Sequence, residues 1–334
     1  MTLVRLSVAL LLLSSGCSFF ADEEPWQQRD LVIGGRPAAI ASEDGSQIGI
    51  YAVNLDGSGL VPILASKANA FIAPSVSPDG SKIVFQSGLG ATTLGPRLYV
   101  VRFDGAPFSW AWKSDVIWSE KFFVGYEARW WTNDTFVFLH CPTCELGGNV
   151  SKLYEANVPR RTVRELDFGD AVWVSPGPDS TYALVRERDT PQHHGRDIVL
   201  RRGSEPNAFE RVLVDGVANG LDWSPSGHAL AYMDIGASFE YHDLVVIDTL
   251  GVEQVRHRLV SPDKVDSMGH GGTFVWLPDG KTVLTSRRRL LPDGERRYTL
   301  VAFDLDDGSV REILDGHVHF DVSVNPLGRL AAAN

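Results

Sequence analysis

The sequence predicts an all-β fold built from repeated hairpins. Near copies of one pattern, an apolar run, a tight turn and a second apolar run, recur about every 40 to 55 residues. The pattern is carried by stretches such as SVSPDGSKIVFQS from Ser75, LDWSPSGHALAYMD from Leu221 and FVWLPDGKTVLTS from Phe274. Pro presets φ at one central turn position and Gly accepts positive φ, as a β-hairpin requires. A second hairpin follows most copies, so each period holds four strands, which is typical of a β-propeller blade.

The number of turns and the two ends of the repeat region predict six blades. The turns lie at Ser77, Thr132, Ser175, Ser224, Leu277 and Asn325. The chain finishes with an incomplete unit, FDVSVNPLGRLAAAN, and its repeats begin with the complementary half, IYAVNLDGSGLVPIL. Joining the N- and C-terminal strands closes a six-bladed β-propeller and removes an open sheet edge. Residues 36–45 compete with GRLAAAN for one strand position, and a β-sandwich with unrelated hairpins is the alternative fold.

The repeats resemble those of the TolB-type six-bladed propellers, which are periplasmic proteins of bacteria. The resemblance is carried by SPDGSKIVFQS followed by LYVVRFDGA, and by IYAVNLDGSG, and it covers about residues 33–334. It implies a periplasmic or surface platform for interactions. Related propellers also include peptidase accessory domains and pectate-type lyases. No partner domain is recognisable before the propeller, so the role of TolB itself is not implied.

Composition restricts the partners. A chain of 334 residues with 44% hydrophobic content can bury one large core, and one closed propeller can use all of it. The formal net charge of −11 argues against nucleic acid, whose phosphates need a basic surface. We expect a monomer whose partner is an envelope protein or another cell-surface ligand.

The N-terminus predicts export and a lipid anchor. MTLVRLSVALLLLSSGC has one cation, Arg5, then an apolar run, then small residues before Cys17, which together resemble a bacterial lipoprotein signal. The apolar run is too short to span a bilayer as a stable helix. We therefore expect a signal peptide over residues 1–16, a lipidated Cys17 that begins a tether over residues 17–32, and the propeller over residues 33–334. Ordinary cleavage without lipidation is the alternative.

Two further cysteines, Cys141 and Cys144, form a Cys-x-x-Cys pair in HCPTCELGG. The export signal places the chain in an oxidising compartment, and the sequence contains no second cysteine pair that could complete a zinc site. We expect a local disulfide that stiffens a loop. An exposed reactive or metal-binding pair is the alternative.

Loop lengths predict which face of the propeller binds a partner. Turns such as SPDG, SPSG, LPDG, LDGSG and DDGS are short, and they should all emerge on one face. The links between second and third strands should emerge on the other face, and they are long: residues 88–97, 140–149, 186–197, 233–243 and 287–297. Long loops on a rigid scaffold commonly carry function. Neutral drift of surface loops is the alternative.

Three histidines could converge at the mouth of the central channel. His317 and His319 form a His-x-His pair that points both rings the same way if it lies on a strand, and His270 enters from the adjacent blade. Such a trio could bind a divalent metal, although histidines at strand starts are more often structural. Equivalent positions of other blades offer Glu127, Asp170 and Asn219.

The common hydrolase and nucleotide-binding motifs are missing from the sequence. It contains no Gly-x-Ser-x-Gly, no phosphate-binding Gly-rich loop and no His-Glu-x-x-His. We therefore expect an envelope-anchored lipoprotein, on the periplasmic or surface side, that acts as a non-catalytic protein- or ligand-binding platform and needs no cofactor. A metal-assisted lyase or hydrolase with a histidine-lined channel mouth is the alternative.

Overall fold

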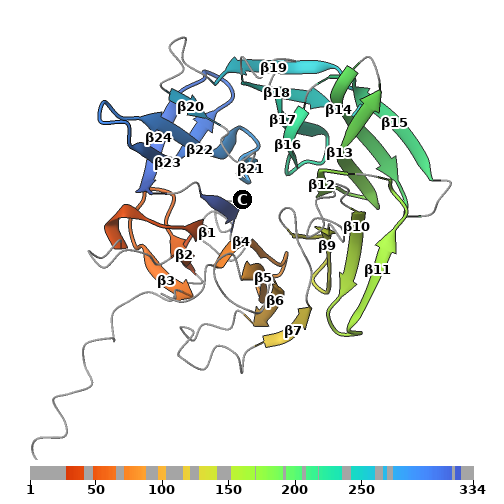
Figure 1. Ribbon diagram of the computed structural model, residues 1–334, viewed down its shortest axis with the longest axis horizontal. Helices are drawn as coiled ribbons and strands as arrows, with labels where there is room; N and C mark the ends of the chain where they lie inside the picture. The colour runs from red at the N-terminus through yellow and green to blue at the C-terminus, as the bar shows by residue number, and fades with distance from the viewer. Residues whose placement is uncertain are drawn as a thin grey trace, which may run out of the picture.

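The fold is a six-bladed β-propeller, as the repeats predict (Figure 1). The computed structural model describes residues 28–40, 48–64, 71–87, 97–102, 116–120, 128–140, 152–169, 171–190, 193–204, 208–216, 218–234, 242–259, 266–268, 274–317 and 320–324. These residues form six antiparallel sheets, the blades, arranged around a central axis. In each blade the strands follow one another from the axis to the rim.

The strands of blades 1 to 3 follow this order. Blade 1 consists of β25 (Asp321–Val324), β1 (Leu31–Gly35), β2 (Gly49–Val53) and β3 (Val61–Leu64). Blade 2 consists of β4 (Phe71–Val76), β5 (Lys82–Ser87), β6 (Arg97–Arg102) and β7 (Val116–Glu120). Blade 3 consists of β8 (Arg129–Trp130), β9 (Thr135–His140), β10 (Lys152–Asn157) and β11 (Thr162–Leu166).

Blades 4 to 6 continue round the ring. Blade 4 consists of β12 (Trp173–Pro176), β13 (Thr181–Thr190), β14 (His193–Arg202) and β15 (Phe209–Val214). Blade 5 consists of β16 (Ala218–Trp223), β17 (Ala229–Asp234), β18 (Asp243–Asp248) and β19 (Glu253–Arg258). In blade 6, two short strands, β20 (Asp266–Met268) and β21 (Phe274–Trp276), pair with β22 (Thr282–Leu290), which β23 (Arg296–Asp304) and β24 (Val310–Gly316) follow.

Blade 1 closes the ring with strands from both ends, but not in the expected proportion. Strand β25 pairs with β1 from Leu31↔Val324 to Gly34↔Asp321, so the N-terminal side supplies three strands. Residues 36–45 do not compete for the second position, because that position belongs to β1. Their described part holds a 3₁₀ turn, η2 (Ala38–Ile40), while GRLAAAN lies outside the described residues.

Strand β1 begins two residues before residue 33, where the sequence suggested that the propeller starts. Arg29 and Asp30, which precede it, are also buried. The backbone N–H of Leu55 donates to the Asp30 carboxylate at 2.9 Å, which fastens this segment to the turn between β2 and β3. The first described strand of the propeller therefore begins within residues 17–32, the segment that the sequence assigned to the tether.

The core lies between neighbouring blades rather than inside any one of them. Alternate side chains of each strand point to opposite faces of its sheet, so every blade can pack apolar residues against both neighbours. Val84 and Leu98 of blade 2, for example, share one buried cluster with Phe136 and Phe138 of blade 3. Closing the ring buries the inner strands of each sheet on both faces, whereas outer strands such as β15 and β19 keep exposed residues.

Tryptophans on the innermost strands link successive blades. The indole Nε1 of Trp130 donates to the backbone oxygen of Ser75 at 2.8 Å, and Trp276 Nε1 donates in the same way to the oxygen of Asp222 at 3.3 Å. In blade 3 the linking residue is thus Trp130, not its neighbour Trp131, whose ring instead lies 5.2 Å from that of Tyr182. The tight turn of blade 3 begins at Trp131, one residue earlier than the repeat suggested. This places Trp130, rather than Trp131, at the strand position that faces the preceding blade.

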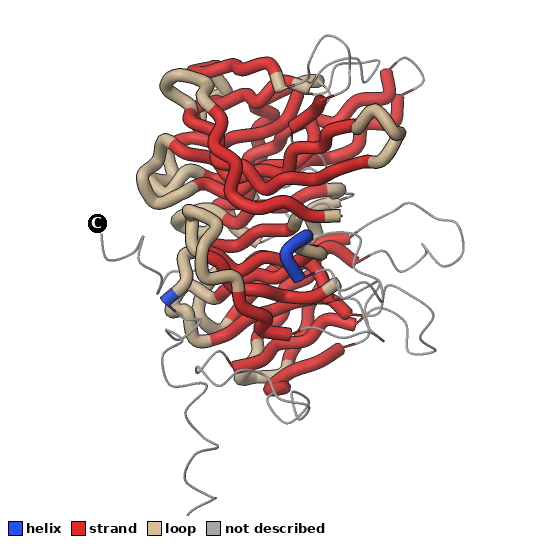
Figure 2. The backbone as a smooth tube through the Cα atoms, turned by 90° about the vertical axis from the view of Figure 1, so that its left-hand side faces the viewer, coloured by secondary structure: helices blue, strands red, loops and turns tan. Residues whose placement is uncertain are grey.

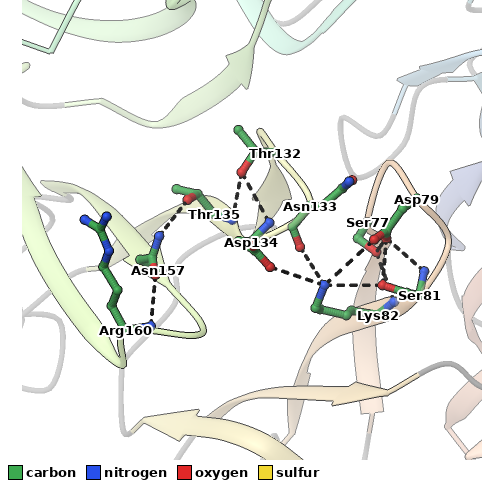
Figure 3. Close-up of polar contacts among 10 residues, drawn as sticks. All are labelled: Ser77, Asp79, Ser81, Lys82, Thr132, Asn133, Asp134, Thr135, Asn157 and Arg160. Carbon is green, nitrogen blue, oxygen red and sulfur yellow. Dashed lines mark hydrogen bonds and ion pairs between the residues drawn. The ribbon is translucent and has the colours of Figure 1, made fainter.

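The SPDG turn of blade 2 is held by its own side chains and joined to blade 3 (Figure 3). The carboxylate of Asp79 accepts hydrogen bonds from Ser77 Oγ at 2.6 Å and from Ser81 N at 3.0 Å. Lys82 Nζ donates to the backbone oxygen of Asn133 at 2.9 Å and lies 3.5 Å from Asp134 Oδ1. The short turns are therefore structural elements as well as connections.

The two faces of the propeller differ in their connections. We call the face that carries the short turns after the first and third strands of each blade the short-turn face, and the opposite one the long-loop face. Figure 2 shows the described short turns gathered along one side of the molecule. Because β1 is the second strand of its blade, it begins on the short-turn face, and so does the described chain.

Candidate binding face

Two β-hairpins extend the long-loop face. Strands β13 and β14 stay paired out to Thr190↔His193, and β22 and β23 stay paired out to Leu290↔Arg296. Two of the five segments expected to be long loops, residues 186–197 and 287–297, are therefore mostly strand. The other three, residues 88–97, 140–149 and 233–243, lie largely outside the described residues.

The base of the blade 4 hairpin is held by two arginines that share one glutamate. Arg201 Nη1 donates to Glu210 Oε2 at 3.1 Å, and its guanidinium lies 4.4 Å from the centre of the Phe168 ring. Arg186 donates to Glu210 as well, and through Nη2 to the backbone oxygen of Phe168 at 2.9 Å. The hydrogen bond from Arg186 is the main cause that lowers the pKa of the Glu210 carboxyl, against the opposing effect of burial. This network fixes the hairpin to the link that leads into blade 4.

The blade 6 hairpin is strongly basic. Residues 287–297 hold five arginines against two acidic residues, in a chain whose net charge is −11. The arginines are Arg287, Arg288, Arg289, Arg296 and Arg297. We call this segment, residues 287–297, the basic finger. Leu290, near its tip, is 43% exposed.

Only one of the three histidines that were predicted at the channel mouth is described. His317 follows β24 on the long-loop face, and its backbone N–H donates to the Arg36 oxygen at 3.0 Å. Its Nδ1 lies 4.0 Å from Glu295 Oε1, at the base of the finger turn. His270, His319, Glu127 and Asp170 lie outside the described residues, as do Cys17, Cys141, Cys144 and the side chain of Asn219.

The convergence of these histidines therefore stays a prediction, as do the lipidation and the disulfide. Among the residues that the structure describes, no group of three or more His, Cys, Asp or Glu residues is arranged to hold a metal ion. Within the same residues, no helix has the length and apolar character that a membrane crossing needs.

The structure reveals a polar site on the innermost strands that sequence reasoning missed. Asp222 of β16 accepts a hydrogen bond from Ser175 Oγ of β12 at 3.1 Å and from the backbone N–H of Trp276 of β21 at 3.3 Å. Burial raises the pKa of the Asp222 carboxyl, while the positive charge of Arg129 opposes this. Asp222 thus joins three blades near the axis. The signal in the sequence was a carboxylate inside the otherwise apolar run LDW.

These features define a closed propeller with an asymmetric pair of faces, and solved structures share its fold. TolB from Acinetobacter baumannii matches with a TM-score of 0.64 at 14% identity, over 90% of this chain and 67% of that chain. Hydrazine synthase from Kuenenia stuttgartiensis matches with a TM-score of 0.58 at 11% identity, over 89% of this chain and 46% of that chain. An oligogalacturonate lyase from Vibrio parahaemolyticus matches with a TM-score of 0.50 at 12% identity, over 85% and 78%.

At these identities the likeness shows the fold alone. No family model matches the sequence, and the comparison with curated proteins finds no match. This chain spans about two thirds of TolB and less than half of the hydrazine synthase chain.

Proposed function

We propose that the protein is a monomeric, envelope-anchored lipoprotein. Its propeller is a non-catalytic platform that binds a protein or ligand on the long-loop face. The observation that carries the proposal is the asymmetry of the faces, since both extended hairpins project from the long-loop face. Rigid scaffolds that display extended segments on one side are suited to binding. The TolB-like fold is consistent with such a role.

The path of the N-terminal segment supports this orientation. The described chain begins on the short-turn face, where Arg29 and Asp30 are buried against the turn between β2 and β3. A lipid anchor at Cys17 would leave eleven residues before Arg29, which reach at most about 40 Å when fully extended. The short-turn face would then lie towards the membrane, and the long-loop face would be presented to partners.

Site-specific photo-crosslinking tests the proposal in intact cells. A photoreactive residue at Leu290, on the long-loop face, should give a discrete crosslinked product with an envelope component. The matched control is Leu250, which is more exposed, at 61% against 43%, but belongs to a short turn of blade 5. Discrete products from Leu250 and none from Leu290 would show that the partner binds the short-turn face and that the proposed face is wrong.

A further inference from the structure

The basic finger has two sides with different surroundings. Leu284 and Leu300, near its base, pack in the cluster shared with blade 1, whereas Val283 and Phe303 pack in the cluster shared with blade 5. Side chains alternate along paired strands, so residues in phase with each set continue on the same side. The finger therefore has a blade 1 side and a blade 5 side.

Two acidic residues pair with the three arginines of the blade 5 side. Arg287 Nη1 and Arg289 Nη2 lie 3.3 and 3.5 Å from the same carboxylate oxygen of Glu312, on β24. Arg297 Nη1 lies 3.7 Å from Asp315 Oδ2. Arg289 and Arg297 stand directly opposite each other, an arrangement that like charges tolerate poorly unless carboxylates are close by. Glu312 and Asp315 supply those carboxylates.

Among the residues that the structure describes, the blade 1 side has no such acidic partners. Arg288 is paired in register with Tyr298, and Leu290 with Arg296, so these four side chains share the surface. Arg288 and Tyr298 are half-buried, and Leu290 and Arg296 are exposed. Within the described part of the chain, no carboxylate forms an ion pair with Arg288 or Arg296. Two guanidinium groups thus flank a leucine and a tyrosine.

We propose that the blade 1 side of the basic finger binds an acidic peptide segment of a partner protein. Carboxylates of that segment pair with Arg288 and Arg296, and an apolar side chain between them packs on Leu290 and Tyr298. Arginine suits this role because its planar guanidinium donates two parallel hydrogen bonds to a carboxylate and packs flat on apolar groups. The inference rests on the proposed function, since it names the chemistry of the partner on the long-loop face.

The charge of the whole chain favours a short acidic peptide over a nucleic acid. A polyphosphate would contact surface well beyond the finger, and a net charge of −11 would repel it. A peptide of a few residues contacts only the finger, where the charge is locally positive. The attraction should weaken as salt rises, because the arginines are partly exposed to solvent.

The test uses the full chain, purified in detergent, and a fluorescent octapeptide of alternating Glu and Leu, with binding followed by anisotropy. The double variant Arg288→Glu/Arg296→Glu should weaken binding by at least about tenfold, which corresponds to about 1.4 kcal/mol. The control Arg160→Glu/Arg202→Glu changes the net charge equally, at exposed arginines on the short-turn side of blades 3 and 4. It should change binding by less than about twofold, which is well under that free energy.

Other outcomes would overturn the inference. Equal weakening by both double variants would mean that net charge alone governs binding, and equal binding of a Lys-Leu octapeptide would mean that apolar attraction does. The melting temperatures of the variants must match that of the wild type, and Arg288→Lys/Arg296→Lys provides a milder change if they do not. If the octapeptide fails to bind while Leu290 still crosslinks in cells, the platform stands and the acidic-peptide inference falls.

Discussion

The indole Nε1 of Trp223, on the innermost strand of blade 5, donates a hydrogen bond to the backbone oxygen of Ser175 in blade 4 at 3.1 Å. The same donor and acceptor positions recur from Trp130 to Ser75 and from Trp276 to Asp222. Each link joins two successive blades through residues that are 48 to 55 positions apart in the sequence, at the point where the blades converge. The links therefore contribute to ring closure as well as to local packing.

Replacing Trp223 by Phe should lower the free energy of unfolding by about 1 to 3 kcal/mol, because the buried Ser175 oxygen loses its donor. Chemical denaturation followed by circular dichroism measures this change. Trp131→Phe is the matched control, since the Trp131 ring is half-buried against Tyr182 and donates to no described carbonyl oxygen. An equal loss in both variants would show that aromatic volume, rather than the hydrogen bond, matters.

Asp79 should make stability depend on pH in acid. Burial alone would raise the pKa of its carboxyl, but hydrogen bonds from Ser77 and Ser81 and the charge of Lys82 outweigh it and lower the pKa to about 2. Since the folded pKa lies below the unfolded value, ionised Asp79 stabilises the fold above about pH 4, and this contribution is lost as the pH falls through about 2.

Asp79→Asn should therefore melt at a lower temperature than the wild type at neutral pH, and the difference should narrow between about pH 4 and pH 2. Asp293→Asn provides the comparison, because the Asp293 carboxylate accepts a hydrogen bond from the backbone N–H of Glu295 in an exposed turn. Its effect should be smaller. A difference for Asp79→Asn that is independent of pH would contradict this explanation.

The sequence predicted the blades because each one repeats the same local chemistry. Proline and glycine fix the short turns, and alternating apolar residues fix the strands on either side. It missed β1 because LVIGG is brief and ends in two glycines, which strands generally disfavour. Pairing with the distant β25 supplies what local propensity lacks.

The extended hairpins were misjudged for a different reason. RERDT in β13 and RRRL in β22 show no apolar alternation, because beyond the propeller body there is no core to face. In β22 the backbone pairing continues there, although Arg287, Arg288 and Arg289 are only half-buried and Leu290 is exposed. The site around Asp222 also escaped prediction, since its partners Ser175 and Trp276 belong to different blades and meet only when the ring closes.

Two glycines in short turns allow the backbone strain of a substitution to be distinguished from its steric clash. Gly57 and Gly280 both have positive φ, 83° and 67°, so replacing either by Ala should cost about 1 to 2 kcal/mol. A β-carbon at Gly57 would also overlap the backbone oxygen of Ile313 in blade 6, whereas one at Gly280 would meet nothing. Gly57→Ala should thus destabilise more in thermal melts. Equal losses of stability in the two variants would mean that the backbone around Ile313 moves away from the new methyl group at little cost.

Lipidation of Cys17 should decide where the protein is found in the cell. Each buried methylene of an acyl chain contributes about 0.8 kcal/mol, so two or more chains anchor a protein stably. Cys17→Ser should move the protein from the membrane pellet to the soluble fraction, while Cys141→Ser should not. If the Cys17→Ser variant still sediments with membranes and the wild type takes up no labelled fatty acid, the prediction of a lipid anchor is wrong. The orientation inferred from that anchor then loses its support.

The remaining alternative, a metal-assisted lyase or hydrolase, makes a different prediction at His317. A binding platform has no need of a resident metal, and the described surroundings of His317 offer one carboxylate, Glu295, at 4.0 Å. We therefore expect protein purified without chelators to contain well under one divalent ion per chain by mass spectrometry, and its melting temperature to be insensitive to added manganese or zinc. About one ion per chain that is lost in His317→Ala/His319→Ala, but kept in His228→Ala on an exposed short turn, would contradict this expectation. Such a result would favour the metal-assisted lyase or hydrolase over the binding platform.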